Sequence, residues 1–186
     1  MQGTLLALAD IACLSFIALL FAQAAMHKLT DFPRFSGYVA EYKLLPESLR
    51  IPASAALIAA ELLTVCLLVF PATKKFGATL ACFLFLAYGV GIGINLARGR
   101  AQIECGCGGA RQFLSSRLLL RNAVLMLFAS VPAIVSVSVP TETLERIAGI
   151  AAGASLWMAY NLIDLLLANG GHMRITARGT GRRVFQ

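Results

Sequence analysis

Two cysteines separated by one glycine are the residues of this sequence whose types and spacing most directly suggest chemistry. Cys105-Gly106-Cys107 is followed at once by Gly108-Gly109. Two thiols this close can join, but a disulfide needs its Cα atoms about 4.4–6.8 Å apart and a particular torsion, so the small ring is strained. Glycines adopt backbone conformations that other residues resist. Because strained, exposed disulfides are easily reduced, the motif predicts a pair that exchanges rather than a structural crosslink.

Arginines on both sides of the pair support this interpretation. Arg98, Arg100 and Arg111 flank the motif, and the next apolar stretch predicts a helix that starts close by. Positive charge and a helix N-terminus both favour a thiolate over a thiol, and the thiolate is the species that attacks a disulfide. We therefore expect Cys105 and Cys107 to be the catalytic residues of a thiol-disulfide oxidoreductase. The alternative is a reduced, glycine-rich turn whose cysteines take no part in chemistry.

Other kinds of site have weaker support. A closed zinc site needs four ligands, and the only histidines are His27 and His172, so we expect no metal. Residues 89–93 alternate glycine with valine or isoleucine like a nucleotide loop, but they lie in an apolar stretch and no strand precedes them. No Ser-His-Asp set and no helix with base-reading side chains is evident. The cysteine pair is therefore the strongest chemical lead.

The other three cysteines lie inside apolar stretches and have two interpretations. In a topology of five spans, Cys13, Cys66 and Cys82 all fall in the half of the bilayer opposite Cys105 and Cys107. They would suit a relay that passes electrons across the membrane, with helix movement or a quinone bridging the gap. Buried cysteine also commonly serves as a small apolar residue. The sequence requires no cofactor, and a quinone is the one that such a relay would use.

Glu61 lies near the middle of a predicted span, where an unpaired carboxylate is costly. Such residues are functional candidates by default. Arg121 and Asn95 are the partners that we consider, while Lys28 is expected at the end of the first span. Glu61 would then handle protons beside the redox pair, lock the bundle through a hydrogen bond, or serve a small transporter.

The elements that must position these residues are apolar enough to lie in a membrane. The 186 residues are 59% hydrophobic and 13% charged, whereas soluble domains are about a quarter charged, which excludes an ordinary soluble enzyme. Five stretches can cross a hydrocarbon layer of roughly 30 Å as helices. They are residues 5–26, 51–70, 76–97, 118–139 and 144–168. We predict an all-α integral membrane protein with one domain over residues 1–186, a four-helix core plus a C-terminal span.

The segments outside the spans differ in character. Residues 27–50 are too polar to span, but they hold Phe and Tyr side chains among charges. Aromatic side chains with a polar tip favour the headgroup layer, so we predict an interfacial, partly helical loop there. Residues 98–117 form the loop that carries the Cys-Gly-Cys motif, and residues 169–186 form a basic tail. We expect this tail to contact anionic lipid.

Basic residues are distributed unevenly between the two sides of the predicted bundle. Of sixteen Lys and Arg, thirteen lie on the side of the Cys-Gly-Cys segment and the C-terminus, and Lys74, Lys75 and Arg146 lie on the other. Cytoplasmic segments carry an excess of Lys and Arg, so the bias predicts the N-terminus outside and the C-terminus inside. Residues 1–9 contain no Lys or Arg, which favours a span over a cleaved signal peptide. The net charge of +7 is therefore explained by the basic residues that orient the protein in the membrane, and we expect no nucleic-acid partner.

Several short motifs occur along the chain in a specific order. They are Tyr42-Lys43-Leu44-Leu45-Pro46, Glu61-Leu62, Ile94 to Arg100, Ile103 to Gly109 and Arg121-Asn122. Together they resemble the methylamine utilisation protein MauE family, which is related to the DoxX-like membrane proteins. The resemblance covers roughly residues 15–130.

The resemblance implies a multi-pass protein of the bacterial inner membrane that supports maturation of the small, disulfide-rich beta subunit of methylamine dehydrogenase. It also implies the thioredoxin-like protein MauD and that beta subunit as partners, with Cys105 and Cys107 as the redox pair. The beta subunit is periplasmic, whereas the charge bias puts the pair in the cytoplasm. Either the three embedded cysteines relay electrons, or residues 144–168 do not span, or the bias misleads.

A non-catalytic membrane scaffold is the alternative function. It would hold the thioredoxin-like partner or the beta subunit in place, as a chaperone does. Two glycine pairs, Gly89 with Gly93 and Gly149 with Gly153, have the four-residue spacing that lets membrane helices approach closely. A scaffold would depend on these packing glycines and would tolerate the loss of both cysteines of the pair.

Overall fold

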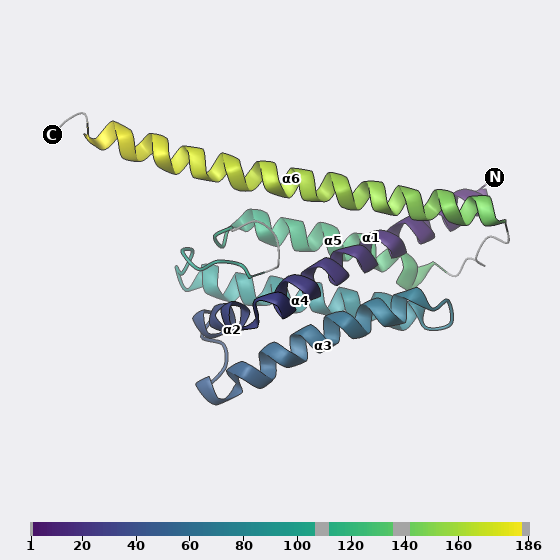
Figure 1. Ribbon diagram of the computed structural model, residues 1–186, viewed down its shortest axis with the longest axis horizontal. Coiled ribbons are helices and arrows are strands. Elements are labelled where there is room, and N and C mark those ends of the chain that lie inside the picture. The colour runs from purple at the N-terminus through teal and green to yellow at the C-terminus, as the bar shows by residue number, and fades with distance from the viewer. Residues whose placement is uncertain (1, 107–111, 136–141, 184–186) are drawn as a thin grey trace.

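The structure is a computed structural model that describes residues 2–106, 112–135 and 142–183, with the backbone alone for residues 2 and 168–183. The described residues are almost entirely helical (Figure 1). The helices are α1 (Gln2–Thr30), α2 (Phe32–Glu41), the 3-10 helix η1 (Glu47–Leu49), α3 (Arg50–Val69), α4 (Lys74–Ala97), α5 (Ser116–Ile134) and α6 (Thr143–Arg183).

Five helical segments of the described chain are long and apolar enough to cross a membrane. They are Gly3–Thr30, Glu47–Val69, Lys74–Ala97, Ser116–Ile134 and Thr143–Leu167. In lipid a helix satisfies its own backbone hydrogen bonds, which is why long apolar stretches become helices there. The all-α membrane bundle that the composition predicts is therefore confirmed, and the protein is a multi-pass membrane protein.

Three helix ends differ from the sequence prediction by four residues or more. The backbone of helix α6 continues to Arg183, whereas the predicted fifth stretch ends at residue 168. Helix α1 continues to Thr30, past the predicted end of the first stretch at residue 26, because Lys28 is buried with a partner instead of marking a polar end. Helix α5 ends at Ile134, and residues 136–139 of the predicted fourth stretch lie outside the described residues.

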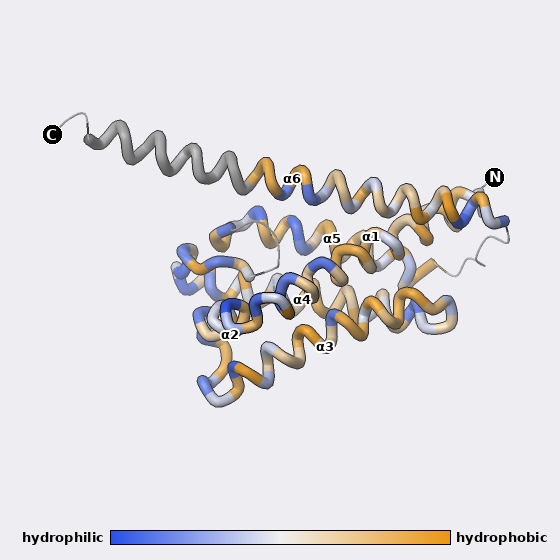
Figure 2. The backbone as a smooth tube through the Cα atoms, in the orientation of Figure 1, coloured by the Kyte–Doolittle hydropathy of each residue, from blue (hydrophilic) through white to orange (hydrophobic). Residues whose placement is uncertain are grey.

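Helices α1, α3, α4 and α5 form the core of the bundle (Figure 1). Large side chains from different helices meet there, and the rings of Phe21 on α1 and Phe85 on α4 have centroids 4.9 Å apart. Outside the core, many leucine, isoleucine and phenylalanine side chains are exposed. Figure 2 shows hydrophobic residues along the helix bodies and hydrophilic ones gathered at the end near α2. This distribution suits a surface that faces lipid tails.

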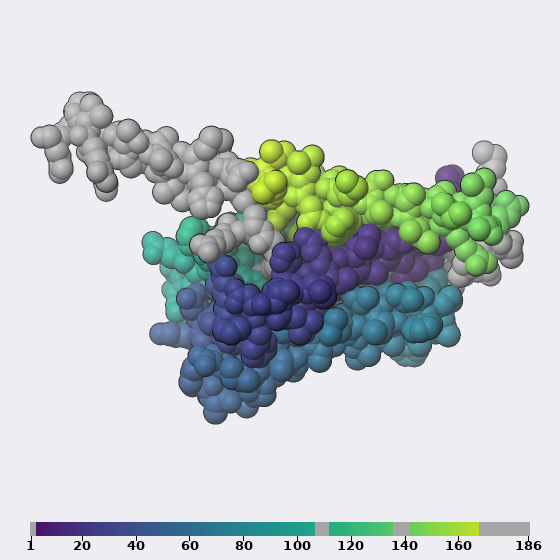
Figure 3. Space-filling model, in the orientation of Figure 1, coloured from purple at the N-terminus to yellow at the C-terminus, as the bar shows by residue number. Residues whose placement is uncertain are grey.

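Helix α6 lies along α1 on one side of the bundle (Figures 1 and 3). A Cβ atom at Gly149 would be 2.7 Å from Ile11, and one at Gly153 would be 2.6 Å from the carbonyl oxygen of Ala12. This glycine pair therefore permits the close approach that its spacing predicts. Side-chain amides add hydrogen bonds across the contact, because Trp157 donates to Gln23 and Gln23 donates to Asn161, each over 2.7 Å.

The same prediction is wrong for Gly89. Its ideal Cβ position has no neighbouring atom within 4 Å, and that of Gly93 has only Leu119, at 4.0 Å. Four-residue spacing alone does not say which side of a helix meets a neighbour, and here this side of α4 has open space at Gly89.

Helix α2 packs against α3 and α1 at one end of the bundle. The Asp31 side chain caps it by accepting a hydrogen bond from the backbone N–H of Arg34, and Pro33 occupies its first turn, where no N–H is needed. Phe35 and Ser36 are its buried residues. It lies within residues 27–50, for which the interfacial position remains a prediction.

The segment after α4 returns to the bundle through a short hairpin. Glu104 and Phe113 form an antiparallel bridge, and the N–H of Leu114 donates to the carbonyl of Ile103 over 3.0 Å. Ile103 and Leu114 are buried in a second small core with Ile92 and Leu118. The hairpin base is therefore anchored between α4 and α5, and it fixes the position of the cysteine segment.

Candidate functional site

Cys105 stands at the edge of this hairpin and is disulfide-bonded. Its N–H donates to the carbonyl of Gln112 over 3.0 Å, so the backbone at the cysteine is held by the opposite arm. The residue is half-buried. Cys107, the other candidate catalytic residue, lies outside the described residues.

Two tyrosines of the α2 region hold the backbone around Cys105. Tyr42 donates a hydrogen bond from its hydroxyl to the Cys105 carbonyl over 3.1 Å. Burial raises the pKa of Tyr42 to about 12, so its hydroxyl stays protonated and able to donate at neutral pH. Gly106 has φ of +67°, and a Cβ there would be 2.9 Å from the Tyr38 ring. Glycine is therefore required between the cysteines for both backbone conformation and space.

Tyr38 also joins a polar cluster at the mouth of the hairpin. Its hydroxyl donates to the Glu104 carboxylate, and Arg34 donates to the same hydroxyl over 2.5 Å. Burial raises the pKa of Tyr38, and the hydrogen bond to Glu104 adds to that rise. The cluster ties α2 to the residue that precedes Cys105.

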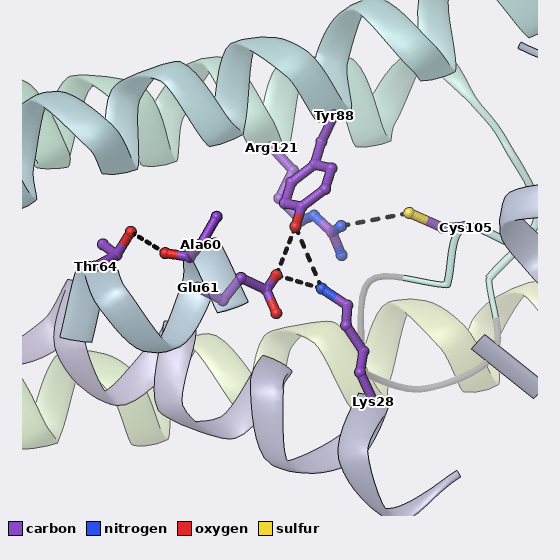
Figure 4. Close-up of polar contacts among 7 residues, drawn as sticks. All are labelled: Lys28, Ala60, Glu61, Thr64, Tyr88, Cys105 and Arg121. Carbon is purple, nitrogen blue, oxygen red and sulfur yellow. Dashed lines mark hydrogen bonds and ion pairs between the residues drawn. The ribbon is translucent and has the colours of Figure 1, made fainter. Parts of the chain in front are cut away.

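Arg121 contacts the Cys105 sulfur, over 3.8 Å from Nη2 to Sγ (Figure 4). It stands little more than one turn into α5 and also pairs with Asp164 of α6, at 3.3 Å. Gln112 of the hairpin donates to the same carboxylate over 2.8 Å. Helix α6 therefore takes part in the site by holding the arginine beside the sulfur.

The arginines that flank the motif in sequence make other contacts. Arg98 donates to the Lys43 carbonyl, and Arg100 donates to the Asn95 side chain over 3.4 Å. Arg111 lies outside the described residues. The two flanking arginines that the structure describes therefore hold the end of α4 and the loop after α2, and the contribution of Arg111 stays a prediction.

A second polar group, buried inside the bundle, lies near this site. Lys28 of α1 and Glu61 of α3 form an ion pair with side chains 3% and 1% exposed. Tyr88 of α4 donates its hydroxyl to the same carboxylate oxygen over 2.6 Å. Figure 4 shows Lys28 and Tyr88 both directed at Glu61. The other oxygen, Oε2, has no hydrogen-bond partner among the described residues.

The partners expected for Glu61 are therefore wrong. Arg121 contacts Cys105 and Asp164, while Asn95 donates to the carbonyl of Gly91 on its own helix. Lys28 reaches Glu61 because the last turns of α1 stay inside the bundle. The ion pair and the hydrogen bond offset the free energy that a buried carboxylate costs in a membrane.

A cavity of about 160 Å³ connects the two polar groups. Its walls include Lys28 and Tyr88 from the buried group, Cys105 and Gly106 from the hairpin, and Phe35 from α2. Most of the remaining lining is apolar or aromatic: Tyr38, Val39, Tyr42, Leu44, Leu45, Leu57, Ala87 and Gly91. Concave, mainly apolar pockets with a few polar groups are typical of small-molecule sites.

Comparison with known proteins places the chain in a family. The model of the family described as methylamine utilisation protein MauE matches residues 5–135. The chain belongs to the MauE family. It is 37% identical over 155 residues to the methylamine utilization protein MauE of Paracoccus versutus, and the match covers 82% of this chain and 83% of the relative. No solved structure matches the chain. In this MauE-family chain the matched residues include the cysteine pair, the buried ion pair and Arg121, but not α6.

The remaining cysteines of the MauE-family chain, Cys13, Cys66 and Cys82, are free. Cys13 is buried in α1, Cys66 is exposed on α3, and Cys82 donates to the Met126 carbonyl over 3.8 Å. Among the residues described, no group of three His, Cys, Asp or Glu side chains is placed to hold a metal ion. The role of these thiols in an electron relay remains a prediction.

Proposed function

We propose that this MauE-family protein carries out thiol-disulfide exchange at Cys105 and Cys107, in support of maturation of the methylamine dehydrogenase beta subunit. The observation that carries the proposal is the disulfide-bonded Cys105, half-buried, with a guanidinium 3.8 Å from its sulfur. A positive group at this position stabilises the thiolate that forms on reduction.

The exchange takes two steps. In the oxidised protein, a thiolate of the partner attacks the Cys105–Cys107 disulfide, so that this S–S bond breaks and a mixed disulfide forms. The partner's second thiolate then attacks the mixed disulfide, and the partner leaves with a new disulfide. Two electrons pass from the partner to the pair, and the protons lost by the partner's two thiols are taken up by Cys105 and Cys107. Arg121 stabilises the anionic sulfur of Cys105 at each stage.

The proposed partners are the thioredoxin-like protein MauD and the beta subunit. The family description and the relative's name, which refer to methylamine utilisation, support this choice. Cysteine exchange also requires a partner that itself contains a disulfide or a dithiol. A disulfide-rich subunit and a thioredoxin-like protein both meet that chemical requirement.

The test replaces each cysteine of the pair with serine in a strain that makes methylamine dehydrogenase. We expect Cys105→Ser and Cys107→Ser each to leave the beta subunit short of disulfides, measured by thiol alkylation and mass spectrometry. Gln102→Ser is the matched control, because Gln102 is exposed on the same segment and carries no thiol. Full disulfide content of the beta subunit in the Cys105→Ser strain would reject the proposal.

A membrane scaffold is the second candidate, and the exposed outer surface of α6 favours it. Helix α6 packs along α1, and large apolar side chains such as Ile147, Met158 and Leu162 remain exposed on it. If the protein is a scaffold, the variant with both Cys105 and Cys107 replaced by serine supports full maturation. Gly153→Leu, in contrast, disrupts the contact of α6 with α1 and abolishes maturation. The opposite pattern supports thiol exchange.

We place the protein in the bacterial inner membrane with its N-terminus outside and the cysteine pair on the cytoplasmic side. Because the beta subunit is periplasmic, this orientation requires Cys13, Cys66 and Cys82 to relay electrons between the subunit and the pair. The distribution of thirteen basic residues against three supports this orientation. A membrane-impermeant maleimide added to intact, reduced cells tests it. We expect Cys105 and Cys107 to be labelled only after the cells are opened. Labelling in intact cells would show that the pair faces the periplasm and would contradict the proposed orientation.

A further inference from the structure

The cavity beside Cys105 has the size and lining of a site for a single flat ring. Its volume is about 160 Å³, and an apolar cavity of roughly 150 Å³ is known to accept benzene. Phe35, Tyr42 and Tyr88 contribute aromatic walls. Aromatic groups pack well against another ring in offset or edge-on arrangements.

Hydrogen-bond donors lie in the same cavity. The Lys28 ammonium is 5.1 Å from the Phe35 ring centroid and 5.0 Å from that of Tyr88. It donates to Glu61 and to Tyr88, and an ammonium has three N–H donors. A ring oxygen in the cavity could therefore accept the remaining one. The ligand that this suits is apolar in its ring and carries carbonyl oxygens.

The surroundings of the cavity indicate that the ligand is lipid-soluble. Leu57, Ala87 and Gly91 belong to the membrane-spanning segments, and Leu44 and Leu45, which also line the cavity, are 41% and 47% exposed. Apolar residues thus reach from the cavity to the outer surface of the bundle. A ligand with an apolar tail can enter along them from the bilayer.

We propose that this cavity binds a membrane quinone that accepts electrons from the reduced cysteine pair. This inference rests on the proposed thiol exchange. An S–S bond forms between Cys105 and Cys107, both S–H bonds break, and the two electrons and two protons pass to the ring oxygens, so the quinone becomes a quinol. Lys28 stabilises negative charge on the nearer oxygen as the electrons arrive. One quinone is consumed for each disulfide formed.

The test mixes purified, pre-reduced full-length protein in lipid nanodiscs with ubiquinone-1 under nitrogen. Quinol formation is followed by absorbance, and the thiols of Cys105 and Cys107 are counted by alkylation. Gly91→Leu fills the cavity, because a Cβ at Gly91 is 3.5–3.6 Å from Tyr42 and Leu44. Gly89→Leu is the matched control, since it places the same side chain on the same helix in open space. Leu45→Trp fills the cavity from the loop without altering a helix.

We expect the wild-type protein and Gly89→Leu to form one quinol per protein. Gly91→Leu and Leu45→Trp should react at least about tenfold more slowly. Equal rates in all four proteins would show that quinone meets the thiols in solution and would overturn the site. A pair that exchanges with a disulfide peptide but is never oxidised by ubiquinone-1 overturns the quinone step alone. A pair that reacts with neither reagent overturns the proposed function and this inference together.

Discussion

Arg121 connects the cysteine pair to the rest of the bundle. Its guanidinium contacts the Cys105 sulfur and the Asp164 carboxylate, and Asp164 is held in turn by Gln112. An opposite charge this close favours the ionised form of a thiol. Because three elements meet at this one side chain, its position is fixed beside the sulfur.

Replacement of Arg121 by glutamine tests this role. We expect Arg121→Gln to slow alkylation of reduced Cys105 near neutral pH by about threefold to tenfold, because a smaller fraction of the sulfur is thiolate. Arg121→Lys keeps the positive charge, so its alkylation rate should lie between the rates of the wild-type protein and Arg121→Gln. The rate is measured by timed alkylation and mass spectrometry of the peptide. Arg117→Gln removes an exposed arginine from the same helix and should leave the rate unchanged; equal slowing in both variants would contradict the specific contact.

At this scale the sequence indicates the thiol pair but not its surroundings. The motif and its glycines are visible because they are contiguous, and Gly106 does need its positive φ. Arg121 is sixteen residues from Cys105, and it reaches the sulfur through the hairpin and the start of α5. The sequence signals for Arg121 are its position just inside the next apolar stretch, which is unusual in a membrane helix, and the Arg121-Asn122 motif that resembles the MauE family.

The contact of α6 with α1 depends on two glycines that are not equivalent. Gly149 faces Cγ2 and Cβ of Ile11, of which rotation about χ1 can move only Cγ2, whereas Gly153 faces two backbone atoms, of Ala12 and Phe16, and the Cβ of Ser15, none of which moves without the main chain. We expect Gly153→Ala to destabilise the protein by about 1–3 kcal/mol, the usual cost of overpacking, and Gly149→Ala to cost less.

Thermal unfolding in detergent measures this difference, with Gly89→Ala as the control. A Cβ at Gly89 meets nothing within 4 Å, and alanine is the better helix former, so this variant should be neutral or more stable. Equal destabilisation by all three substitutions would show that loss of glycine, and not the crossing of two helices, is responsible.

The buried pair of Lys28 and Glu61 links α1 to α3. Removal of one partner leaves an uncompensated buried charge, which typically costs about 3–5 kcal/mol, whereas replacement of both by apolar residues is often neutral. We therefore expect Lys28→Met and Glu61→Leu each to lower the unfolding temperature and the double variant to recover most of the loss. If the double variant shows the sum of the two single losses, the pair does not act as a unit.

The sequence predicts the helices better than it predicts how they face each other. Each apolar stretch becomes a helix because lipid leaves the backbone no other partner. The rotation of one helix against another depends on packing, so the 33-residue separation of Lys28 and Glu61 gives no sign of their contact. The glycine spacing likewise predicts contacts for both pairs, and Gly89 makes none within 4 Å.

For the whole molecule, two buried ion pairs lie eighteen residues apart along α1. Asp10 pairs with Lys74 of α4, and Lys28 pairs with Glu61. Eighteen residues of helix between Asp10 and Lys28 correspond to about 27 Å, close to the thickness of the hydrocarbon layer. Both lysines are therefore neutralised inside the bundle, and each side loses one basic residue from its count. The strong bias between the two sides remains, in agreement with the proposed orientation.

The central claim is that the cysteine pair cycles between bonded and free forms. Trypsin cleaves after Arg100 and Arg111, so peptide 101–111 contains both Cys105 and Cys107 and no other cysteine. Cells are quenched with acid, free thiols are alkylated, disulfides are reduced, and a heavy alkylating reagent marks the thiols released. We predict that peptide 101–111 is found in two forms, a light form from the reduced pair and a heavy form from the disulfide. The heavy fraction should change when beta-subunit synthesis is switched on. A peptide that is always fully light, with or without the subunit, would contradict the account.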